Sequence, residues 1–532
     1  MTQRFYVTTP IYYVNDAPHI GHSYTTIAAD VLARYHRAEG YDVRFLTGTD
    51  EHGIKIVKAA AEKGMGPREL ADQVVVHFQQ LWKDLNISND DFIRTTQERH
   101  EKRVQEIIRR LVAKDEIYAG SYAGWYDEGQ EEFVTESTAR ETEYKSAISG
   151  KPLVRYSEKS YFFHLAKWIP ALKQHILANP DFIQPDSRRN EVLSKLEQGV
   201  EDLSISRASE KLGGWGIAMP NDPTHSVYVW IDALSNYYTA LGLPDIGDGA
   251  DPALGSYWPA SLHLIGKDIL WFHCVYWPCL LMALGERLPT TVFAHGWWTS
   301  EGKKMSKSLG NFVSKEVILE LCGEYHRDAF RYFVLREVPF GVDGDFSRAA
   351  FQQRYNVELA NAIGNLLSRT VNMIGRYFDA AVPETQQALL AGSSVALREL
   401  TGLEAEHLAG PLQALGQEVP VLMAHCQFSL VLQKVMELAT AVNRYIDVTS
   451  PFTLAKDPSQ RPRLGTILYT CAEAVRIVLN YLSPFMPEKT ATGLAQLGLT
   501  IGSESLSQRV RWGVLEPGTK VAKGEPLFPR KQ

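Results

Sequence analysis

The spacing of apolar residues near the start of the chain predicts a strand, a helix and a second strand. Residues 5–9 (FYVTT) are typical of a buried strand. Apolar residues then recur at helical spacing from Ile27 to Tyr35, and Gly40 follows as a C-cap. A second strand is expected at 43–46. Strand, helix and strand in this order form a βαβ unit, and such units build doubly wound parallel sheets.

The same pattern returns much later in the chain. Strands expected at 262–265 and 292–294 flank a helix expected at 268–284. The stretch 116–220 has turn-rich segments and an aromatic strand at 161–163, which indicate an inserted domain. We therefore predict an α/β fold, in which a split Rossmann-like, doubly wound parallel sheet carries an inserted connective domain.

From about residue 350 onward the apolar spacing is helical, beginning with one face that runs from Leu359 to Tyr377. Further helical patterns follow at 394–416, 428–449 and 464–482. They predict an all-α helical bundle, and the Gly- and Pro-rich stretch 512–529 is expected to dock back on the body. The expected domains are the first half of the sheet at 1–115, the insertion at 116–220, the second half at 221–295, a loop region at 296–350 and the bundle at 351–532.

Composition narrows the functional classes. The chain is 45% hydrophobic and 22% charged, which is ordinary for a globular protein. A net charge of −7 argues against a nucleic-acid binder driven by overall charge, so any RNA contact must be local. Five cysteines without a CxxC pair indicate reduced thiols and a cytoplasmic location. The longest apolar stretch, 269–284, contains His273 and Pro278 and is too short to span a bilayer, so no membrane association is expected.

Two histidines, His19 and His22, lie three residues apart at the predicted start of the first helix. The free N–H groups and the dipole of a helix N-terminus attract anions, and the imidazoles add donors. Gly21 has no side chain, so a flat ring such as adenine could pack against its backbone. Two ordinary surface histidines are an equally good interpretation of this tetrapeptide alone.

A second candidate is the basic loop KMSKS at 304–308, between Gly302 and Gly310. Lysine ammonium groups act as point charges for phosphates, although a solvated basic loop would be favoured if the loop stood alone. Its combination with His19 and His22 favours an enzyme that joins a substrate carboxylate to the α-phosphate of ATP. Mg²⁺ would bridge the phosphates of that ATP.

These segments, with others, resemble the methionyl-tRNA synthetases, which are class I aminoacyl-tRNA synthetases. The similar segments are collinear: TTPIYYVNDAPHIGH (8–22), FLTGTDEHG (45–53), VYVWIDALSNY (227–237), LIGKDILWFH (264–273), HGWWTSEGKKMSKSLGN (295–311), ANAIGNLLSRT (360–370) and GEPLFPR (524–530). The resemblance implies that L-methionine is activated as methionyl-adenylate. It also implies transfer to tRNA(Met), including the initiator tRNA.

The resemblance implies roles for particular residues. Those expected to act on the phosphates are His19, His22, Lys304 and Lys307. Those expected to bind ATP are His19, Gly21, His22, Lys267, Asp268, Lys304, Ser306 and Lys307. Those expected to bind methionine are Ile11, Tyr13, Asp50, Trp230, Leu234, Tyr237, Ile269 and His273. Those expected to read the anticodon are Asn365, Arg369 and Phe452, while 296–350 would hold the KMSKS loop and contact the tRNA stem.

The chemistry of the implied methionine pocket is consistent. Asp50 can pair with the substrate ammonium, and the rings of Tyr13 and Trp230 offer favourable contacts to a thioether. Spacing alone would assign these aromatic residues to plain core packing. Arg207 matches a position beside the substrate, and a structural salt bridge explains it equally well.

The chain departs from the family in three places. Phe452 stands where the family usually has tryptophan; it can still stack on a base but has no indole N–H. The insertion has no cysteine, so we expect no structural zinc and a knuckle held by aromatic packing. The aromatic residues expected there are Tyr122, Trp125, Tyr126 and Phe133. The dimerising domain of some relatives is absent, so a monomer is expected.

Three other functions are considered. A class I synthetase for another amino acid would differ in the pocket around Tyr13, Trp230 and His273. A catalytically silent tRNA-binding homologue need not retain both His19/His22 and the lysines of the KMSKS loop. An adenylating enzyme that uses no RNA would have no need of a helical bundle with Asn365 and Arg369.

Overall fold

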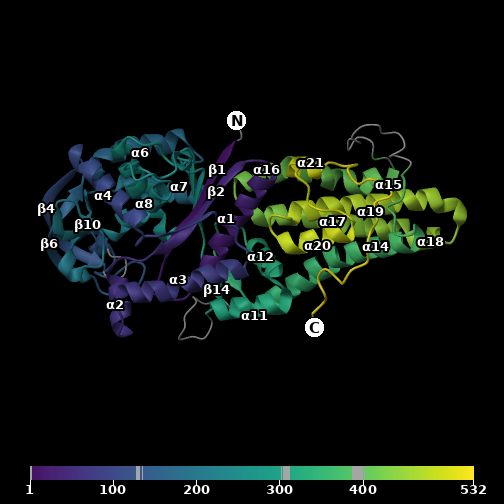
Figure 1. Ribbon diagram of the computed structural model, residues 1–532, viewed down its shortest axis with the longest axis horizontal. Coiled ribbons are helices and arrows are strands. Elements are labelled where there is room, and N and C mark those ends of the chain that lie inside the picture. Colours follow the sequence, from purple (N-terminus) through teal and green to yellow (C-terminus); the bar gives the residue numbers. More distant parts are fainter. Residues whose placement is uncertain are drawn as a thin grey trace.

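The computed structural model describes residues 3–127, 132–134, 136–300, 302, 312–385, 400 and 402–531. The molecule is elongated and has two lobes, an α/β lobe and a helical lobe (Figure 1). Helices α1 (Ile20–Ala38) and α12 (Arg327–Arg336) lie where the lobes meet. Buried residues of both helices belong to one apolar core that continues into the helical lobe, so the lobes are packed together.

The α/β lobe is built on a six-stranded sheet in the order β3-β2-β1-β12-β13-β7. All neighbouring strands are parallel. The strands are β1 (Arg4–Tyr13), β2 (Asp42–Asp50), β3 (Asp91–Arg94), β7 (Ile183–Gln184), β12 (Leu262–Gly266) and β13 (Thr291–His295). The central strand β1 pairs with β2 on one side and with β12, from the second half of the chain, on the other. This arrangement confirms the split, doubly wound parallel sheet.

Helices pack around this sheet. They are α1, α2 (Ile54–Glu62), α3 (Pro67–Asp84), α4 (Glu98–Ala113), α8 (Val229–Thr239), α9 (Pro252–Gly255) and α10 (Trp277–Leu284). The helix expected over 268–284 has an irregular course: a 3₁₀ turn at Lys267–Ile269 and a π-helical turn at Phe272–Tyr276 precede α10. Pro278, near the start of α10, has no N–H and crowds the preceding turn, which explains the widened π-helical geometry.

The segment expected as an insertion, 116–220, forms two antiparallel sheets together with the residues that follow it up to Val227. The larger has the order β5-β4-β6-β8 and the smaller β10-β11-β9. These strands are β4 (Ile117–Asp127), β5 (Glu132–Val134), β6 (Val154–Phe163), β8 (Leu203–Ser204), β9 (Ser206–Ala208), β10 (Ala218–Met219) and β11 (Asp222–Val227). The helices are α5 (Glu136–Glu141), α6 (Leu165–Ala178) and α7 (Asp186–Glu197), with a 3₁₀ turn at Ser209–Leu212. The segment also supplies β7, an edge strand of the main sheet, and so short a strand carries no periodic signal.

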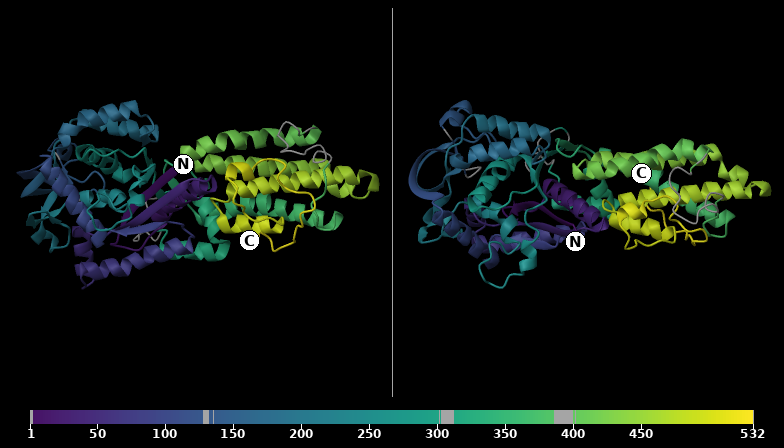
Figure 2. Two further views of the ribbon diagram at one scale, coloured as in Figure 1. Left: turned by 45° about the horizontal axis from the view of Figure 1, so that its top comes forward. Right: turned by 90° about the horizontal axis from the view of Figure 1, so that it is seen from above.

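The rest of the described chain is mainly helical, and Figure 2 shows its long helices running side by side. The helices are α11 (Lys315–Tyr325), α12, α13 (Arg348–Arg354), α14 (Asn365–Tyr377), α15 (Gly402–Glu404), α16 (Gly410–Ala424), α17 (Phe428–Thr449), α18 (Pro451–Leu454), α19 (Arg461–Leu482), α20 (Pro487–Gln496) and α21 (Leu506–Arg509). π-Helical turns at Tyr355–Gly364 and Ala405–Ala409 and a 3₁₀ turn at Pro458–Gln460 join them, and β14 (Trp298–Ser300) pairs with β15 (Gly344–Phe346). The pattern expected at 394–416 lies partly outside the described residues, and its described part continues to Ala424.

The last described residues cross the bundle without regular secondary structure, apart from one bridge between Lys520 and Ala381. The hydroxyl of Tyr469 donates to the carbonyl of Leu515 at 2.9 Å, and that of Tyr355 donates to the carbonyl of Pro529 at 2.9 Å. These bonds hold the segment against the helices that it covers.

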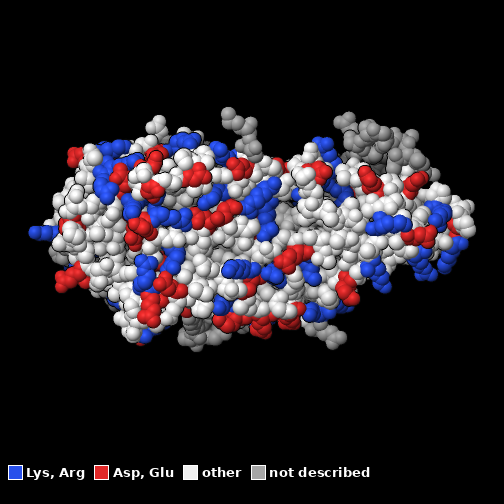
Figure 3. All heavy atoms as spheres, viewed as in Figure 1, with Lys and Arg blue, Asp and Glu red and all other residues white. Residues whose placement is uncertain are grey.

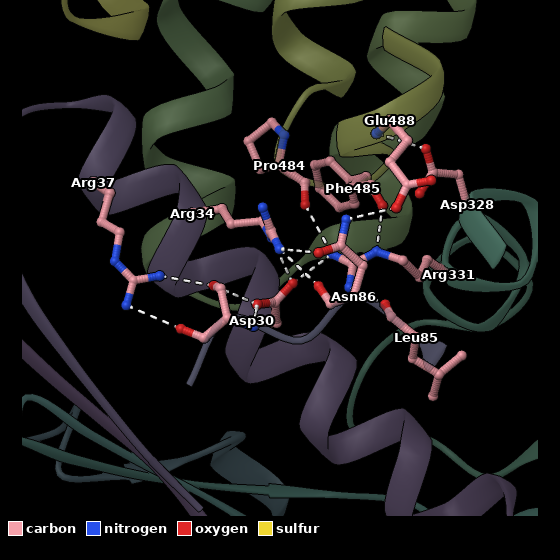
Figure 4. A network of polar contacts seen from close by, with 11 residues as sticks. Asp30, Arg34, Arg37, Leu85, Asn86, Asp328, Arg331, Pro484, Phe485 and Glu488 are labelled. Atoms are coloured by element: carbon pink, nitrogen blue, oxygen red, sulfur yellow. Dashed lines mark hydrogen bonds and ion pairs between the residues drawn. The ribbon is translucent and has the colours of Figure 1, made fainter. Parts of the chain in front are cut away.

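A fully buried ion pair fastens α1 to the helical lobe (Figure 4). Arg331 of α12 lies 2.7 Å from Asp30 of α1, and neither side chain is exposed. Its guanidinium also donates to the carbonyls of Leu85, Pro484 and Phe485 at 2.9–3.2 Å. One side chain therefore joins the α/β lobe to the turn between α19 and α20.

Candidate active site

A cavity of about 510 Å³ opens at the carboxyl ends of the central strands. Its lining includes Tyr13 at the end of β1, Asp50 at the end of β2, Gly266 at the end of β12 and His295 at the end of β13. β1 lies where the order of the strands reverses, with β2 on one side and β12 on the other. Ligands of open α/β sheets bind at this kind of position.

The cavity brings together segments that are far apart in the sequence. The residues expected to bind methionine all line it: Ile11, Tyr13, Asp50, Trp230, Leu234, Tyr237, Ile269 and His273. Four of the residues expected to bind ATP line it too: His19, Gly21, His22 and Asp268. The residues expected to bind the amino acid and four of those expected to bind the nucleotide therefore share one cavity.

His19 and His22 cap the start of α1 reciprocally. The backbone N–H of Gly21 donates to His19 Nδ1 at 3.1 Å, and the backbone N–H of His19 donates to His22 Nδ1 at 3.1 Å. A neutral imidazole that accepts at Nδ1 carries its proton on Nε2. Each ring can therefore donate a hydrogen bond from Nε2 to a phosphate oxygen. The two ring centroids are 3.9 Å apart, so both rings can serve the same group.

The charge state of His22 follows from its surroundings. Burial of the ring, with a smaller effect from neighbouring His19, lowers the pKa of His22 well below its ordinary value. His22 is therefore neutral at pH 7 and acts as a hydrogen-bond donor without a full charge.

The opposite wall of the cavity is aromatic. The rings of Trp230 and Phe272 stack with centroids 3.7 Å apart. The Tyr237 hydroxyl lies 2.7 Å from His273 Nε2, while His273 Nδ1 lies 2.9 Å from the carbonyl of Ile269. Because a carbonyl only accepts, His273 carries its proton on Nδ1 and Tyr237 donates to Nε2. Burial lowers the pKa of His273 to about 4, so this arrangement persists at neutral pH.

Lys267 and Asp268 follow β12 and contact Trp297. The ammonium of Lys267 donates to both carboxylate oxygens of Asp343 at 2.7 Å and lies 4.3 Å from the ring centre of Trp297. The indole N–H of Trp297 donates to Asp268 at 3.1 Å. Asp268 lines the cavity, whereas Lys267 is not among the described lining residues. Lys267 is thus bound to Asp343, next to Asp268 of the cavity lining.

Three expected residues, Lys304, Ser306 and Lys307, lie outside the described residues. The chain on either side of them is well anchored. The backbone N–H of Gly302 donates to Asp345 at 2.9 Å, and the backbone N–H of Ile20 donates to the carbonyl of Val313 at 3.1 Å. The chain that follows the lysines therefore bonds directly to the start of α1.

Several lining residues were missed from the sequence. They are Pro10, Tyr12, Ile20, Thr25, Lys55, Ala233, Gly266, His295, Gly296, Trp297, Trp298 and Phe312. The run from His295 to Trp298 directly follows a buried strand, and that position was a usable signal. Gly296 is required there, because a Cβ would come within 2.3 Å of the backbone of Val342.

The residues expected to read an anticodon lie on the helical lobe. Asn365 and Arg369 belong to α14, and Phe452 belongs to α18 and is 46% exposed. Arg369 forms an ion pair with Asp447 of α17 at 2.8 Å. Figure 3 shows Lys and Arg side chains gathered at the outer end of this lobe, where α17 ends and α18 lies.

Arg207 lies in β9, within the insertion. Its guanidinium donates to the carbonyl of Ser206 at 2.8 Å and lies 4.2 Å from the ring centre of Tyr228. In the expected knuckle, Trp125 packs against Tyr144 with centroids 4.7 Å apart. The side chains of Tyr122 and Phe133 are outside the described residues.

The described residues hold neither a candidate metal cluster nor a candidate membrane-spanning helix. Among the residues that the structure describes, no group of three or more His, Cys, Asp or Glu could hold a metal ion. None of the helices within the described ranges is long and apolar enough to cross a membrane.

The fold and the cavity are those of the class I tRNA synthetases: the model of the family described as tRNA synthetases class I (M) matches residues 5–371. The methionine–tRNA ligase of Caldanaerobacter subterraneus subsp. tengcongensis is 48% identical over 532 residues, with 100% of this chain and 79% of that protein covered. The methionine–tRNA ligase of Rickettsia felis is 43% identical over 531 residues, with 100% of this chain and 99% of that protein covered. The chain therefore belongs to the methionyl-tRNA synthetase family.

A solved structure agrees with this assignment. Mycobacterium tuberculosis methionyl-tRNA synthetase in complex with methionyl-adenylate is 40% identical to this chain and superposes with a TM-score of 0.90. The match covers 99% of this chain and 100% of that chain.

Proposed function

We propose that this protein activates L-methionine with ATP and transfers it to tRNA(Met). The observation that carries the proposal is the single cavity in which His19, His22 and Asp50 meet the aromatic wall of Trp230 and Tyr237. The relatives' names and the adenylate in the similar solved structure support the same reaction.

In this reaction Asp50 binds the methionine ammonium and the aromatic wall receives the thioether. A carboxylate oxygen of methionine attacks the α-phosphorus of ATP, the bond to the β-phosphate breaks, and pyrophosphate leaves. The Nε2–H groups of His19 and His22 donate to the phosphate oxygens as their charge grows. Lys304 and Lys307 contribute positive charge, and Mg²⁺ bound with the ATP would neutralise part of the phosphate charge. A terminal ribose hydroxyl of the tRNA then attacks the methionyl carbonyl, and AMP leaves.

Recognition of the tRNA is assigned to the helical lobe. The exposed ring of Phe452 can stack on an unpaired base, and Asn365 with Arg369 can hydrogen-bond to base edges. The bundle at 351–532 would read the anticodon of the elongator and the initiator tRNA. The region 296–350 would contact the tRNA stem.

The proposal also covers the metal content, the oligomeric state and the cellular location of the protein. We infer a metal-free insertion, because its sequence contains no cysteine to bind zinc. We infer that a single chain is the catalytic unit, because His19, His22, Asp50 and the aromatic residues come together within it. We infer a cytoplasmic protein, because each of the five cysteines is free.

The test is amino-acid-dependent exchange between ATP and pyrophosphate, run without tRNA for each amino acid, with and without a zinc-selective chelator. Exchange with methionine alone, unchanged by the chelator, is the expected result. Exchange with another amino acid would overturn the substrate, and loss on chelation would overturn the metal-free insertion. The second step needs a separate charging assay with methionine tRNA: exchange with methionine but no charging in that assay would overturn the transfer step.

A further inference from the structure

Three buried titratable side chains form a hydrogen-bonded chain close to the cavity. His52 Nδ1 lies 2.7 Å from one carboxylate oxygen of Asp232, and His100 Nε2 lies 2.7 Å from the other. The exposed fractions of His52, Asp232 and His100 are 4%, 1% and 0%. None of the three lines the cavity among its described residues. A carboxylate buried between two imidazoles costs free energy to desolvate, and this cost makes a specific role worth testing.

The three residues come from elements that shape the methionine subsite. Asp50 is the last residue of β2, and His52 follows it by two residues. Asp232 belongs to α8, the helix that presents Trp230, Leu234 and Tyr237 to the cavity. The chain of hydrogen bonds therefore connects the strand that binds the ammonium to the helix that receives the side chain.

The third element, α4, anchors β2 and α8 to the body of the α/β lobe. His100 Nδ1 lies 2.7 Å from the hydroxyl of Thr239, at the last residue of α8. Asp232 and Thr239 thus bind the two nitrogens of one imidazole. Since α4 carries His100, both points of contact fix the position of α8 relative to α4.

Glu51, between Asp50 and His52, is also fixed. The guanidinium of Arg94 donates to its two carboxylate oxygens at 2.6 and 2.9 Å, and the hydroxyl of Thr96 donates at 2.6 Å. The indole of Trp215 donates to the Glu51 carbonyl at 2.6 Å. The backbone on the β2 side is therefore rigid, and the Asp232 contacts set where α8 lies against it.

The charges in this cluster balance. Burial alone would raise the pKa of Asp232, but His52 and His100 outweigh it and lower the pKa. Burial alone would lower the pKa of His52, but Asp232, then Glu101 and Glu51, outweigh it and raise the pKa. The groups that face His52 are Asp232 from α8, Glu101 at 3.8 Å from α4, Glu51 from its own loop and the ring of Trp215.

We propose that Asp232, bound on both sides by His52 and His100, is a positioning residue that sets the distance between α8 and Asp50 and so tunes methionine affinity. This inference rests on the proposed function. The distance decides whether the ammonium and the thioether can be bound at once. ATP binds to the other subsite, at the start of α1 and the end of β12, so its affinity does not depend on the cluster.

The cluster also makes methionine binding sensitive to pH. The pKa of His52 is raised in the folded protein, so its charged contact with Asp232 is complete at low pH and is lost as the pH rises through that pKa. The KM for methionine should therefore increase as the pH rises above about 6.5, the ordinary histidine value, with no parallel increase in the KM for ATP.

The experiment measures ATP–pyrophosphate exchange by the full chain carrying Asp232→Asn, with methionine and ATP varied separately. We expect the KM for methionine to rise roughly 10- to 100-fold, as for other misplaced binding groups, with the KM for ATP unchanged. The pH dependence of the methionine KM should disappear in His52→Gln. The matched control is Asp248→Asn, which removes an ion pair of 2.6 Å to Arg103 on the same helix α4 without touching α8. It should leave both KM values unchanged.

Equal increases in both KM values, or a methionine KM independent of pH in the parent protein, would overturn the inference. If Asp232→Asn does not fold, Thr239→Val removes the outer bond to His100, together with a long bond of 3.4 Å from the same hydroxyl to the carbonyl of Asn236, and should still raise the methionine KM alone. No change in Thr239→Val would then overturn it. Failure of the parent protein to exchange with methionine would instead contradict the proposed function.

Discussion

Asp30 and Arg331 form an ion pair of 2.7 Å in which neither side chain is exposed to solvent. Asp30 lies on α1, the helix whose start is capped by His19 and His22, and Arg331 also bonds to the turn between α19 and α20. A second arginine, Arg34, bonds to Asp30 at 2.7 Å (Figure 4). One carboxylate thus links α1 to the helical lobe.

Replacing Arg331 with methionine should destabilise the protein by about 3–5 kcal/mol, because it leaves buried charge on Asp30 incompletely paired. Urea unfolding measures this loss. The double variant Asp30→Asn/Arg331→Met should recover part of it, since the unpaired charge is then gone. Simple addition of the two single losses would contradict the assigned interaction.

The same pair predicts how stability changes with pH. Burial tends to raise the pKa of Asp30, but Arg331 and then Arg34 outweigh it, so the pKa is lowered on folding. The stabilisation is complete above the ordinary aspartate pKa of about 4 and is lost as the pH falls below it. In Asp30→Asn the acid limb of the unfolding free energy should be shallower. An unchanged acid limb would argue against this assignment.

His22→Asn should separate helix capping from catalysis. The asparagine carbonyl can take the place of Nδ1 and accept from His19, but nothing replaces the Nε2 donor. Stability should change little, whereas adenylate formation should slow by roughly 10²–10³-fold. His22→Gln is the matched variant: it should lose about 1 kcal/mol of capping and retain more activity. Single-turnover adenylation and thermal unfolding measure the two effects, and the reverse ranking would refute the assigned tautomer.

Tyr237→Phe removes the hydroxyl that donates to His273 and leaves a buried ring nitrogen without its bond. Activation of methionine should fall about tenfold, and activation of norleucine, which has no sulfur, should fall less. Exchange kinetics with both amino acids make the comparison. Because the pKa of His273 is about 4, its titration should not alter methionine binding between about pH 6 and 8. Equal losses for both amino acids would mean that the hydroxyl only supports the wall.

Arg369→Ala should reduce aminoacylation of methionine tRNA by at least tenfold and leave pyrophosphate exchange intact, because α14 is remote from the cavity lining. The control is Asp447→Ala, which removes the partner of Arg369 but not its charge. That variant should retain aminoacylation. A parallel loss of both reactions in Arg369→Ala would show that the ion pair supports the fold instead.

Lys307→Ala should depress the rate of adenylation by roughly 10²-fold and leave methionine binding, followed by equilibrium dialysis, almost unchanged. The lysine is assigned to the phosphates, and the methionine subsite lies on the aromatic wall. Similar losses in binding and in rate would be incompatible with this role.

The sequence predicts those parts of the fold whose signal is local. The central strands, α1, α17 and α19 have clear periodicity, and the structure has them close to the expected ranges. The residues expected to bind methionine meet in the cavity because they lie near the carboxyl ends of parallel strands, shortly after such an end, or on helix α8. The two-residue edge strand β7 had no comparable signal.

Buried polar contacts between distant segments could not be predicted from the sequence. The charged run at 98–110 is typical of a solvated helix face, and Lys102 is indeed exposed, but His100 and Arg103 of the same run are buried. His100 is buried because Asp232 and Thr239 bind it, and Arg103 because Asp248 pairs with it. Their partners follow by more than a hundred residues, so no periodic pattern could reveal them.

The pairing of β1 with β12 has a consequence for synthesis of the protein on the ribosome. Thr8 meets His263, which follows it by 255 residues, through a hydrogen bond of 2.7 Å. At typical elongation rates the first strand waits on the order of 13–50 s for this neighbour to be made. During that time one edge of β1 is open to wrong partners. The nascent chain therefore passes through a long interval in which half of the sheet exists without a methionine pocket, and this interval is where a chaperone would be needed most.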